Sequence, residues 1–109
     1  MLSAKVKEMI PKIQTYLASQ PVNKAWLFGS CSRGEETADS DVDILVQYAK
    51  DEQITLFTIS RIICSLNKLL GKRVDLVEDE GILPFAIESV NHDKILIYER
   101  QSLPTLGNN

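Results

Sequence analysis

The chain has 109 residues, of which 44% are hydrophobic and 25% are charged, and its 15 acidic and 12 basic side chains give a net charge of -3. This composition predicts one folded domain and excludes a disordered chain, while the acidic balance argues against strong non-specific nucleic-acid binding. No apolar run approaches the roughly 20 residues of a membrane span, and the isolated Cys31 and Cys64 fit no metal or disulfide pattern, so we expect a cytoplasmic protein with reduced thiols.

The first part of the chain predicts a helix followed by a short buried strand. Apolar residues recur at helical spacing over residues 2–17, and Pro11 must kink this helix or mark the first turn of a shorter one. We favour one kinked helix. Residues 25–28 form an apolar run that ends at Gly29, which is typical of a buried strand stopping at a tight turn, and Trp26 is expected to fill the core there.

A second strand is predicted over residues 42–48. Side chains alternate along an extended chain, so the apolar residues Val42, Ile44 and Val46 fall on one face. Asp41 and Asp43 then lie together on the other face.

Residues 51–70 predict the longest helix, which begins with acidic residues and ends at Gly71. One apolar stripe of this helix is expected to pack on the sheet, and it consists of Leu56, Ile59, Ile62, Ile63, Leu66, Leu69 and Leu70. Ile54, Phe57 and Cys64 lie roughly opposite that stripe. Two interpretations stay open for them, a docking surface for a partner or a helix covered on both sides by its own domain.

A third strand is predicted over residues 73–77, where Val74 and Leu76 point one way and Asp75 points the other. As in the second strand, an otherwise apolar strand therefore carries a carboxylate on one face.

The end of the chain predicts a short helix over residues 84–91 and a final strand over residues 95–98. His92, in a polar turn, is expected to be solvated and is assigned no function. We expect one domain over residues 1–100 and a loose polar tail over residues 101–109.

The three aspartates have the pattern of a metal site. Asp41 and Asp43 share a strand face and can ligate the same cation, and Asp75 from another strand would complete a site for two cations about 3.5–4 Å apart. Oxygen ligands without His or Cys suit Mg²⁺ or Mn²⁺ rather than zinc. Paired cations of this kind hold the attacking and leaving oxygens of a phosphoryl displacement.

The turn after the first strand has the features of a phosphate site. Gly29 allows the backbone to come close to a phosphate, the Ser30 hydroxyl can donate a hydrogen bond, and Arg33 adds a charged donor. The alternative for Arg33 is a surface ion pair with Glu35 or Glu36.

Two segments together resemble a known signature. Residues 26–34 read WLFGSCSRG and residues 40–46 read SDVDILV, and this pattern is similar to that of the minimal nucleotidyltransferases (MNT) of the DNA-polymerase-beta-like superfamily. Residues 73–77 and 87–98 also suit the family. The resemblance implies an α/β (α+β) fold with a small mixed sheet of 3–4 strands flanked by helices. It also implies transfer of a nucleoside monophosphate from a nucleoside triphosphate, with two Mg²⁺ ions.

The resemblance further implies a biological role. Many members are antitoxins that silence a HEPN-domain RNase toxin by attaching AMP, from ATP, to one of its tyrosines. Matched by position, the triphosphate would be bound by Gly29 and Ser30 with help from Arg33. The catalytic and metal-binding residues would be Asp41, Asp43 and Asp75, and Asp75 would also take the proton of the acceptor hydroxyl.

Two features bear on the acceptor. The segment over residues 35–39 is acidic and offers the phosphates no basic side chain, and the chain lacks the helical substrate domain of larger relatives. We therefore expect a docked protein acceptor. The rival hypotheses are a non-catalytic module that binds a toxin, and an enzyme that acts on RNA ends or a small molecule with a helper subunit. The preferred base and the homo- or hetero-oligomeric state stay open.

Overall fold

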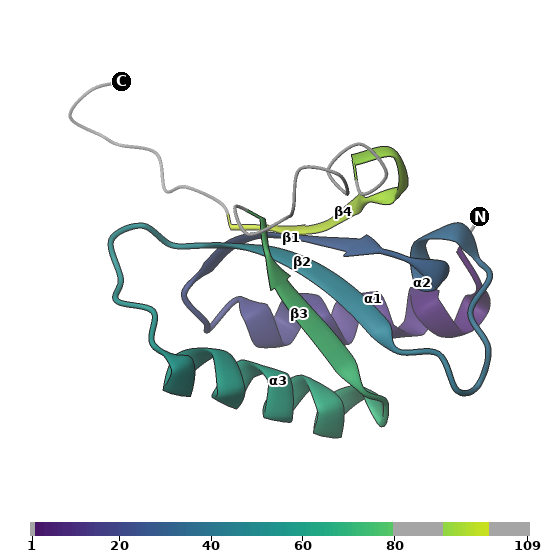
Figure 1. Ribbon diagram of the computed structural model, residues 1–109, viewed down its shortest axis with the longest axis horizontal. Coiled ribbons are helices and arrows are strands. Elements are labelled where there is room, and N and C mark those ends of the chain that lie inside the picture. The colour runs from purple at the N-terminus through teal and green to yellow at the C-terminus, as the bar shows by residue number, and fades with distance from the viewer. Residues whose placement is uncertain (1, 80–90, 101–109) are drawn as a thin grey trace.

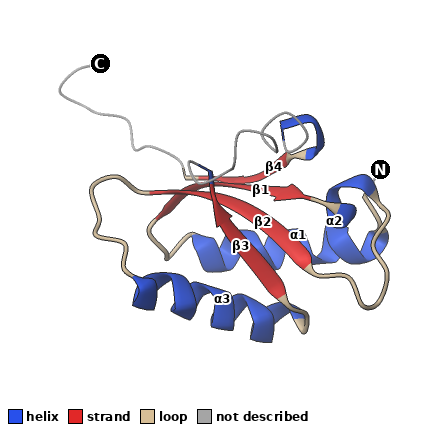
Figure 2. Cartoon of the chain, viewed as in Figure 1, coloured by secondary structure: helices blue, strands red, loops and turns tan. Residues whose placement is uncertain are grey.

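The computed structural model describes residues 2–79 and 91–100 (Figure 1). Its helices and strands, coloured by type in Figure 2, run in the order α1 (Ala4–Leu17), β1 (Val22–Phe28), α2 (Ser30–Arg33), β2 (Val42–Tyr48), α3 (Leu56–Leu70), β3 (Val74–Glu78) and β4 (Ile95–Glu99). The helix predicted up to residue 91 lies almost wholly outside the described residues, and the tail over residues 101–109 lies outside them entirely.

Within the described residues the four strands form one mixed sheet in the order β3-β2-β1-β4. β1 pairs antiparallel with both β2 and β4, whereas β2 and β3 run parallel and are connected through α3. The two long helices α1 and α3 lie on the same side of this sheet (Figure 1). The expected mixed sheet flanked by helices is therefore confirmed, and so are all four predicted strands.

The N-terminal segment forms a single helix that contains Pro11, so the shorter-helix alternative is wrong. Ser3 caps the helix, because its hydroxyl accepts a hydrogen bond from the Val6 amide at 3.2 Å. The side chain of Gln14 also donates to the carbonyl of Ile97 at 2.8 Å, which fixes α1 against β4.

The long helix α3 begins at Leu56 rather than at Asp51, which corrects the predicted start. Thr55 and Thr58 form a reciprocal cap, in which the Thr55 hydroxyl accepts from the Thr58 amide at 3.2 Å and the Thr58 hydroxyl accepts from the Thr55 amide at 3.3 Å. This cap satisfies amides that otherwise lack a partner, so the helix starts there and the acidic residues remain in the preceding loop.

Four residues of the predicted α3 stripe pack on the core, namely Ile59, Ile62, Leu66 and Leu70, whereas Leu56 and Leu69 are exposed. Ile62 and Leu66 are fully buried, whereas Leu56 is 81% exposed. On the other face Phe57 is 88% exposed, but Ile54 packs against the core. The second apolar face is therefore real only around the first turn of the helix. No helix in the described part of the chain is both long enough and apolar enough to cross a membrane.

The core lies between the two long helices and one face of the sheet. The strands contribute Val22, Ala25, Leu27, Val42, Ile44, Val46, Tyr48, Val74 and Ile97 to it. Trp26 does not belong to this core, because alternation places it on the other face of β1. It is only half-buried there, and the Lys94 ammonium lies 4.8 Å from the centre of its ring.

Candidate active site

Asp43 lies on the central strand β2 between two neighbouring strands. It pairs with Phe28 at the end of β1 and with Asp75 on the parallel strand β3. Directly paired residues project to the same face of a sheet, so Asp43 and Asp75 share the face opposite the helices. The register therefore brings together two carboxylates that are 32 positions apart in the sequence.

The start of β3 is fixed by contacts that the sequence does not suggest. The amide of Val74 donates to the side-chain oxygen of Asn67 on α3 at 2.7 Å, and the carbonyl of Arg73 accepts from the amide of Val42 at 2.9 Å. These bonds set the position of Asp75, one residue later.

The charges around Asp43 destabilise its ionised form. Burial raises the pKa of the half-buried Asp43 carboxyl, the charges of Asp75 and Asp41 raise this pKa further, and Arg33 partly lowers it. Asp41 and Asp75 themselves are exposed. A cation at this position would offset the repulsion among the three carboxylates.

The three aspartates are near one another without forming a closed ligand set. Within residues 2–79 and 91–100, no group of three or more His, Cys, Asp or Glu side chains has an arrangement that could hold a metal ion. The donors are nevertheless all carboxylates, with one half-buried and two accessible, and this chemistry fits a hard divalent cation.

Gly29 makes a sharp turn directly against the Asp43 carboxylate. Its φ of +74° lies in a region that side chains disfavour, and a Cβ added there would overlap the Oδ2 atom of Asp43. Both the backbone conformation and the available space therefore require glycine at this position.

The turn continues into the one-turn helix α2, which the sequence did not predict. Ser32 is buried, and its hydroxyl donates to the carbonyl of Gly29 at 2.7 Å. The buried Cys31 thiol lies 3.7 Å from the carbonyl of Asp41, so α2 is linked to the entry of β2. Ser30, the first residue of α2, is half-buried.

Lys72 is a further basic residue near the site that the sequence interpretation missed. Its ammonium donates to the carbonyls of Ala38 at 3.2 Å and Thr37 at 3.5 Å, in the loop that leads from α2 to β2. The contact spans 34 positions, so no local pattern could have indicated it. Lys72 thus fixes the acidic loop, although it does not reach the Gly29 turn through these contacts.

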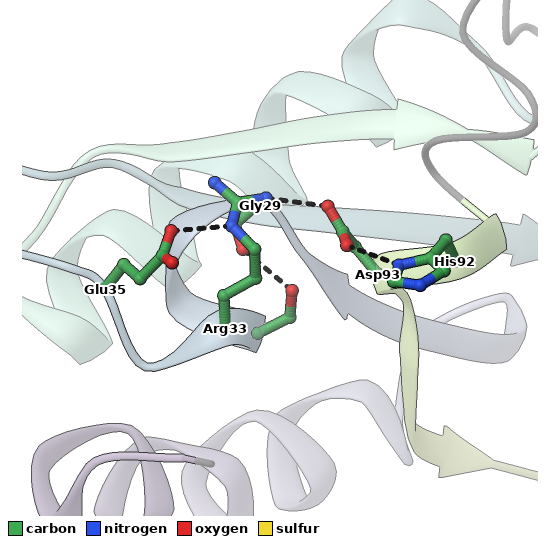
Figure 3. A network of polar contacts seen from close by, with 6 residues as sticks. Gly29, Arg33, Glu35, His92 and Asp93 are labelled. Atoms are coloured by element: carbon green, nitrogen blue, oxygen red, sulfur yellow. Dashed lines mark hydrogen bonds and ion pairs between the residues drawn. The ribbon is translucent and has the colours of Figure 1, made fainter.

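Arg33 is held in a network of polar contacts (Figure 3). Its Nε donates to Glu35 at 2.8 Å and its Nη1 donates to Asp93 at 2.7 Å. The ion pair with Glu35 is the alternative that the sequence left open, and Asp93 is a second partner that the sequence did not indicate. His92, whose side chain is 88% exposed, contacts only the other oxygen of Asp93 among the described residues.

Comparisons with known proteins identify the family of this chain. A family model described as "Polymerase beta, Nucleotidyltransferase" matches residues 11–103. A Methanocaldococcus jannaschii protein named "Putative protein adenylyltransferase" is 32% identical over 96 residues, which cover 86% of this chain and 96% of the relative. These two matches extend over nearly the whole domain.

Solved structures give the same result. A "putative minimal nucleotidyltransferase" superposes with a TM-score of 0.72 at 32% identity, over 87% of this chain and 95% of the other. A complex of the tri-AMPylated Shewanella oneidensis HEPN toxin with an MNT antitoxin matches with a TM-score of 0.63 at 19% identity, over 88% and 74% of the two chains, and at this identity it shows the fold alone. The chain belongs to the polymerase beta nucleotidyltransferase family and is a minimal nucleotidyltransferase.

Proposed function

We propose that this enzyme transfers AMP from ATP to a tyrosine hydroxyl of a HEPN-type toxin and thereby acts as an antitoxin. The observation that carries the proposal is the register that sets Asp43 beside Asp75, with the Gly29 turn directly against Asp43. The similarity to a named protein adenylyltransferase and to the MNT chain of an AMPylated HEPN complex supports the choice of acceptor. Because ATP is the donor, the proposed location is the cytoplasm.

Asp41, Asp43 and Asp75 would hold divalent cations, with two Mg²⁺ as the first choice and Mn²⁺ as a substitute. Such ions neutralise the triphosphate and stabilise the charge that develops on the leaving pyrophosphate. The half-buried Asp43 would be the central ligand because both of the other carboxylates act on its charge.

The remaining residues would bind and orient the reactants. Gly29 brings its backbone close to the triphosphate, the Ser30 hydroxyl donates to a phosphate oxygen, and Arg33 supplies a charged donor. The tyrosine oxygen then forms a bond to the α-phosphorus while the bond from that phosphorus to pyrophosphate breaks. Asp75 takes the proton of the tyrosine hydroxyl, a role that suits its exposed position on the edge strand β3.

The direct test is AMP transfer to the protein encoded by the adjacent gene, which the proposal expects to be a HEPN-type toxin. Labelled ATP and Mg²⁺ are incubated with that protein and with the wild type, Asp41→Asn or Asp43→Asn, and Asp39→Asn serves as a matched control because it removes an exposed charge from the preceding loop. We expect label on a partner tyrosine, mapped by mass spectrometry, with the wild type and the control only. Undiminished labelling by the two site variants would refute the assigned chemistry.

A non-catalytic module that binds the toxin is the second candidate. The exposure of Leu56 and Phe57 at the start of α3 favours it, because exposed large apolar side chains can mark an interface. The two functions differ in a cell-protection assay. A triple variant of Asp41, Asp43 and Asp75 to Asn should fail to protect cells from the toxin if AMP transfer is required, and it should still protect them if binding suffices.

A further inference from the structure

The Arg33 guanidinium is held by two carboxylates that come from different parts of the chain. Glu35 is two positions away in the same loop, whereas Asp93 is 60 positions away and immediately precedes the segment that enters β4. Figure 3 shows the guanidinium between them. α2, which follows the phosphate turn directly, is thus connected to the far edge of the sheet through one side chain.

The two carboxylates differ in how firmly they are held. The Asp93 side chain is 19% exposed, and its second oxygen contacts the Nδ1 atom of His92 at 3.2 Å. Hydrogen bonds with His92 and Arg33 lower the pKa of Asp93 from its ordinary value. The Glu35 side chain is 64% exposed, and an ion pair with that much solvent around it contributes little free energy.

The guanidinium has donors left for a ligand. Arginine carries five N–H donors in a planar fork, and two of them make the contacts with Glu35 and Asp93 among the described residues. A phosphate oxygen that replaced the solvated Glu35 would meet a guanidinium whose plane is still fixed by Asp93. Holding the fork in advance reduces the entropy that is lost on binding.

We propose that Asp93 is a positioning residue that orients Arg33 for the triphosphate, while Glu35 is an exchangeable partner that the triphosphate displaces. The proposal rests on the proposed function only in assuming that Arg33 contacts bound ATP. It assigns opposite roles to two carboxylates that both contact the same guanidinium.

The opposite roles predict opposite changes in ATP affinity. If only charge mattered, removal of either carboxylate would tighten the binding of an anionic nucleotide. We expect Glu35→Gln to lower the Kd for ATP about twofold to fivefold, and Asp93→Asn to raise it about fivefold to tenfold because the fork is no longer fixed. Titration calorimetry with Mg²⁺ and ATP measures both values, and AMP transfer should show a changed KM with a smaller change in kcat.

An Arg33→Ala background provides the control. Asp93→Asn should cause no further loss of ATP affinity there, because the residue it positions is gone, and thermal melting checks that each variant is folded. Tightened binding by Asp93→Asn, or a loss of affinity that is equally large in the Arg33→Ala background, would overturn the proposal. A wild type that does not bind ATP would overturn the proposed function as well, whereas ATP binding without AMP transfer would refute the function and still decide the role of Asp93.

Discussion

The two faces of the sheet use the same strands for different purposes. On the face covered by α1 and α3, side chains such as Leu27 and Ile44 are at most 1% exposed and form the core. The adjacent residues, Phe28 after Leu27 and Asp43 before Ile44, project to the opposite face, where Asp43 is near other carboxylates. Because side chains alternate along a strand, adjacent positions of the same strand contribute to the core on one face and to the candidate site on the other.

This separation predicts that substitutions on the two faces have different consequences. The first and largest effect is expected from Asp43→Asn, which should lower AMP transfer at least about 10³-fold, since loss of the proposed metal ligand would remove several kcal/mol of charge stabilisation. The free energy of unfolding without metal should not fall, because the substitution removes a half-buried charge that its neighbours repel. Assays of AMP transfer and urea denaturation measure the two quantities. If Asp43→Asn lowered both the free energy of unfolding and AMP transfer, the two faces of the sheet would not have separate roles.

The converse is expected for the core. Ile62→Ala removes a fully buried side chain of α3 and should lower the free energy of unfolding by about 2–5 kcal/mol, with AMP transfer per folded molecule unchanged. Phe57→Ala, at an 88% exposed position of the same helix, should change stability by no more than about 0.5 kcal/mol. Denaturation curves compare the two, and similar losses from both would show that α3 packs differently.

A pair of glycines sharpens the comparison further. Gly29 and Gly71 both have positive φ angles, of +74° and +65°, but an added Cβ meets Asp43 at Gly29 and nothing within 4 Å at Gly71. Gly71→Ala should cost about 1–2 kcal/mol of stability from left-handed backbone strain. Gly29→Ala should cost more, because its φ of +74° and ψ of -155° lie in a region essentially restricted to glycine and the added Cβ overlaps Asp43. Only Gly29→Ala should also lower AMP transfer, by about tenfold or more, because it would displace Asp43, the proposed metal ligand. Equal activity of the two variants would argue against the contact.

The smallest effect is a pH dependence of stability. The pKa of Asp43 is raised in the folded protein, so the folded state binds more protons than the unfolded state just above the ordinary value of 3.8. Stability contributed by this group is therefore lost as the pH rises through the folded pKa. In chelator, Asp43→Asn should gain stability relative to the wild type between about pH 4 and pH 7, and added Mg²⁺ should reduce the difference. A difference that does not vary with pH would exclude the proposed charge repulsion.

The local pattern of the sequence determined much of the fold. Alternation in β2 and β3 placed the aspartates opposite the apolar residues, and the apolar run before Gly29 indicated where β1 ends, because both features depend on neighbouring positions alone. The start of α3 was placed too early because the acidic residues suggested a helix end, whereas the reciprocal Thr55 and Thr58 cap decided it.

What only the tertiary structure decided are contacts between residues far apart in the chain. The parallel register of Asp43 and Asp75, the bond from Lys72 to the loop before β2, and the ion pair of Arg33 with Asp93 span 32, 34 and 60 positions. The sequence shows which side chains are present and which face of a strand each one occupies. Which strands pair, and in which register, depends on how the connecting helices pack on the sheet. For that reason the sequence could predict which strands carry Asp43 and Asp75 and which face they share, while the long-range partners of Arg33 and Lys72 could not be predicted.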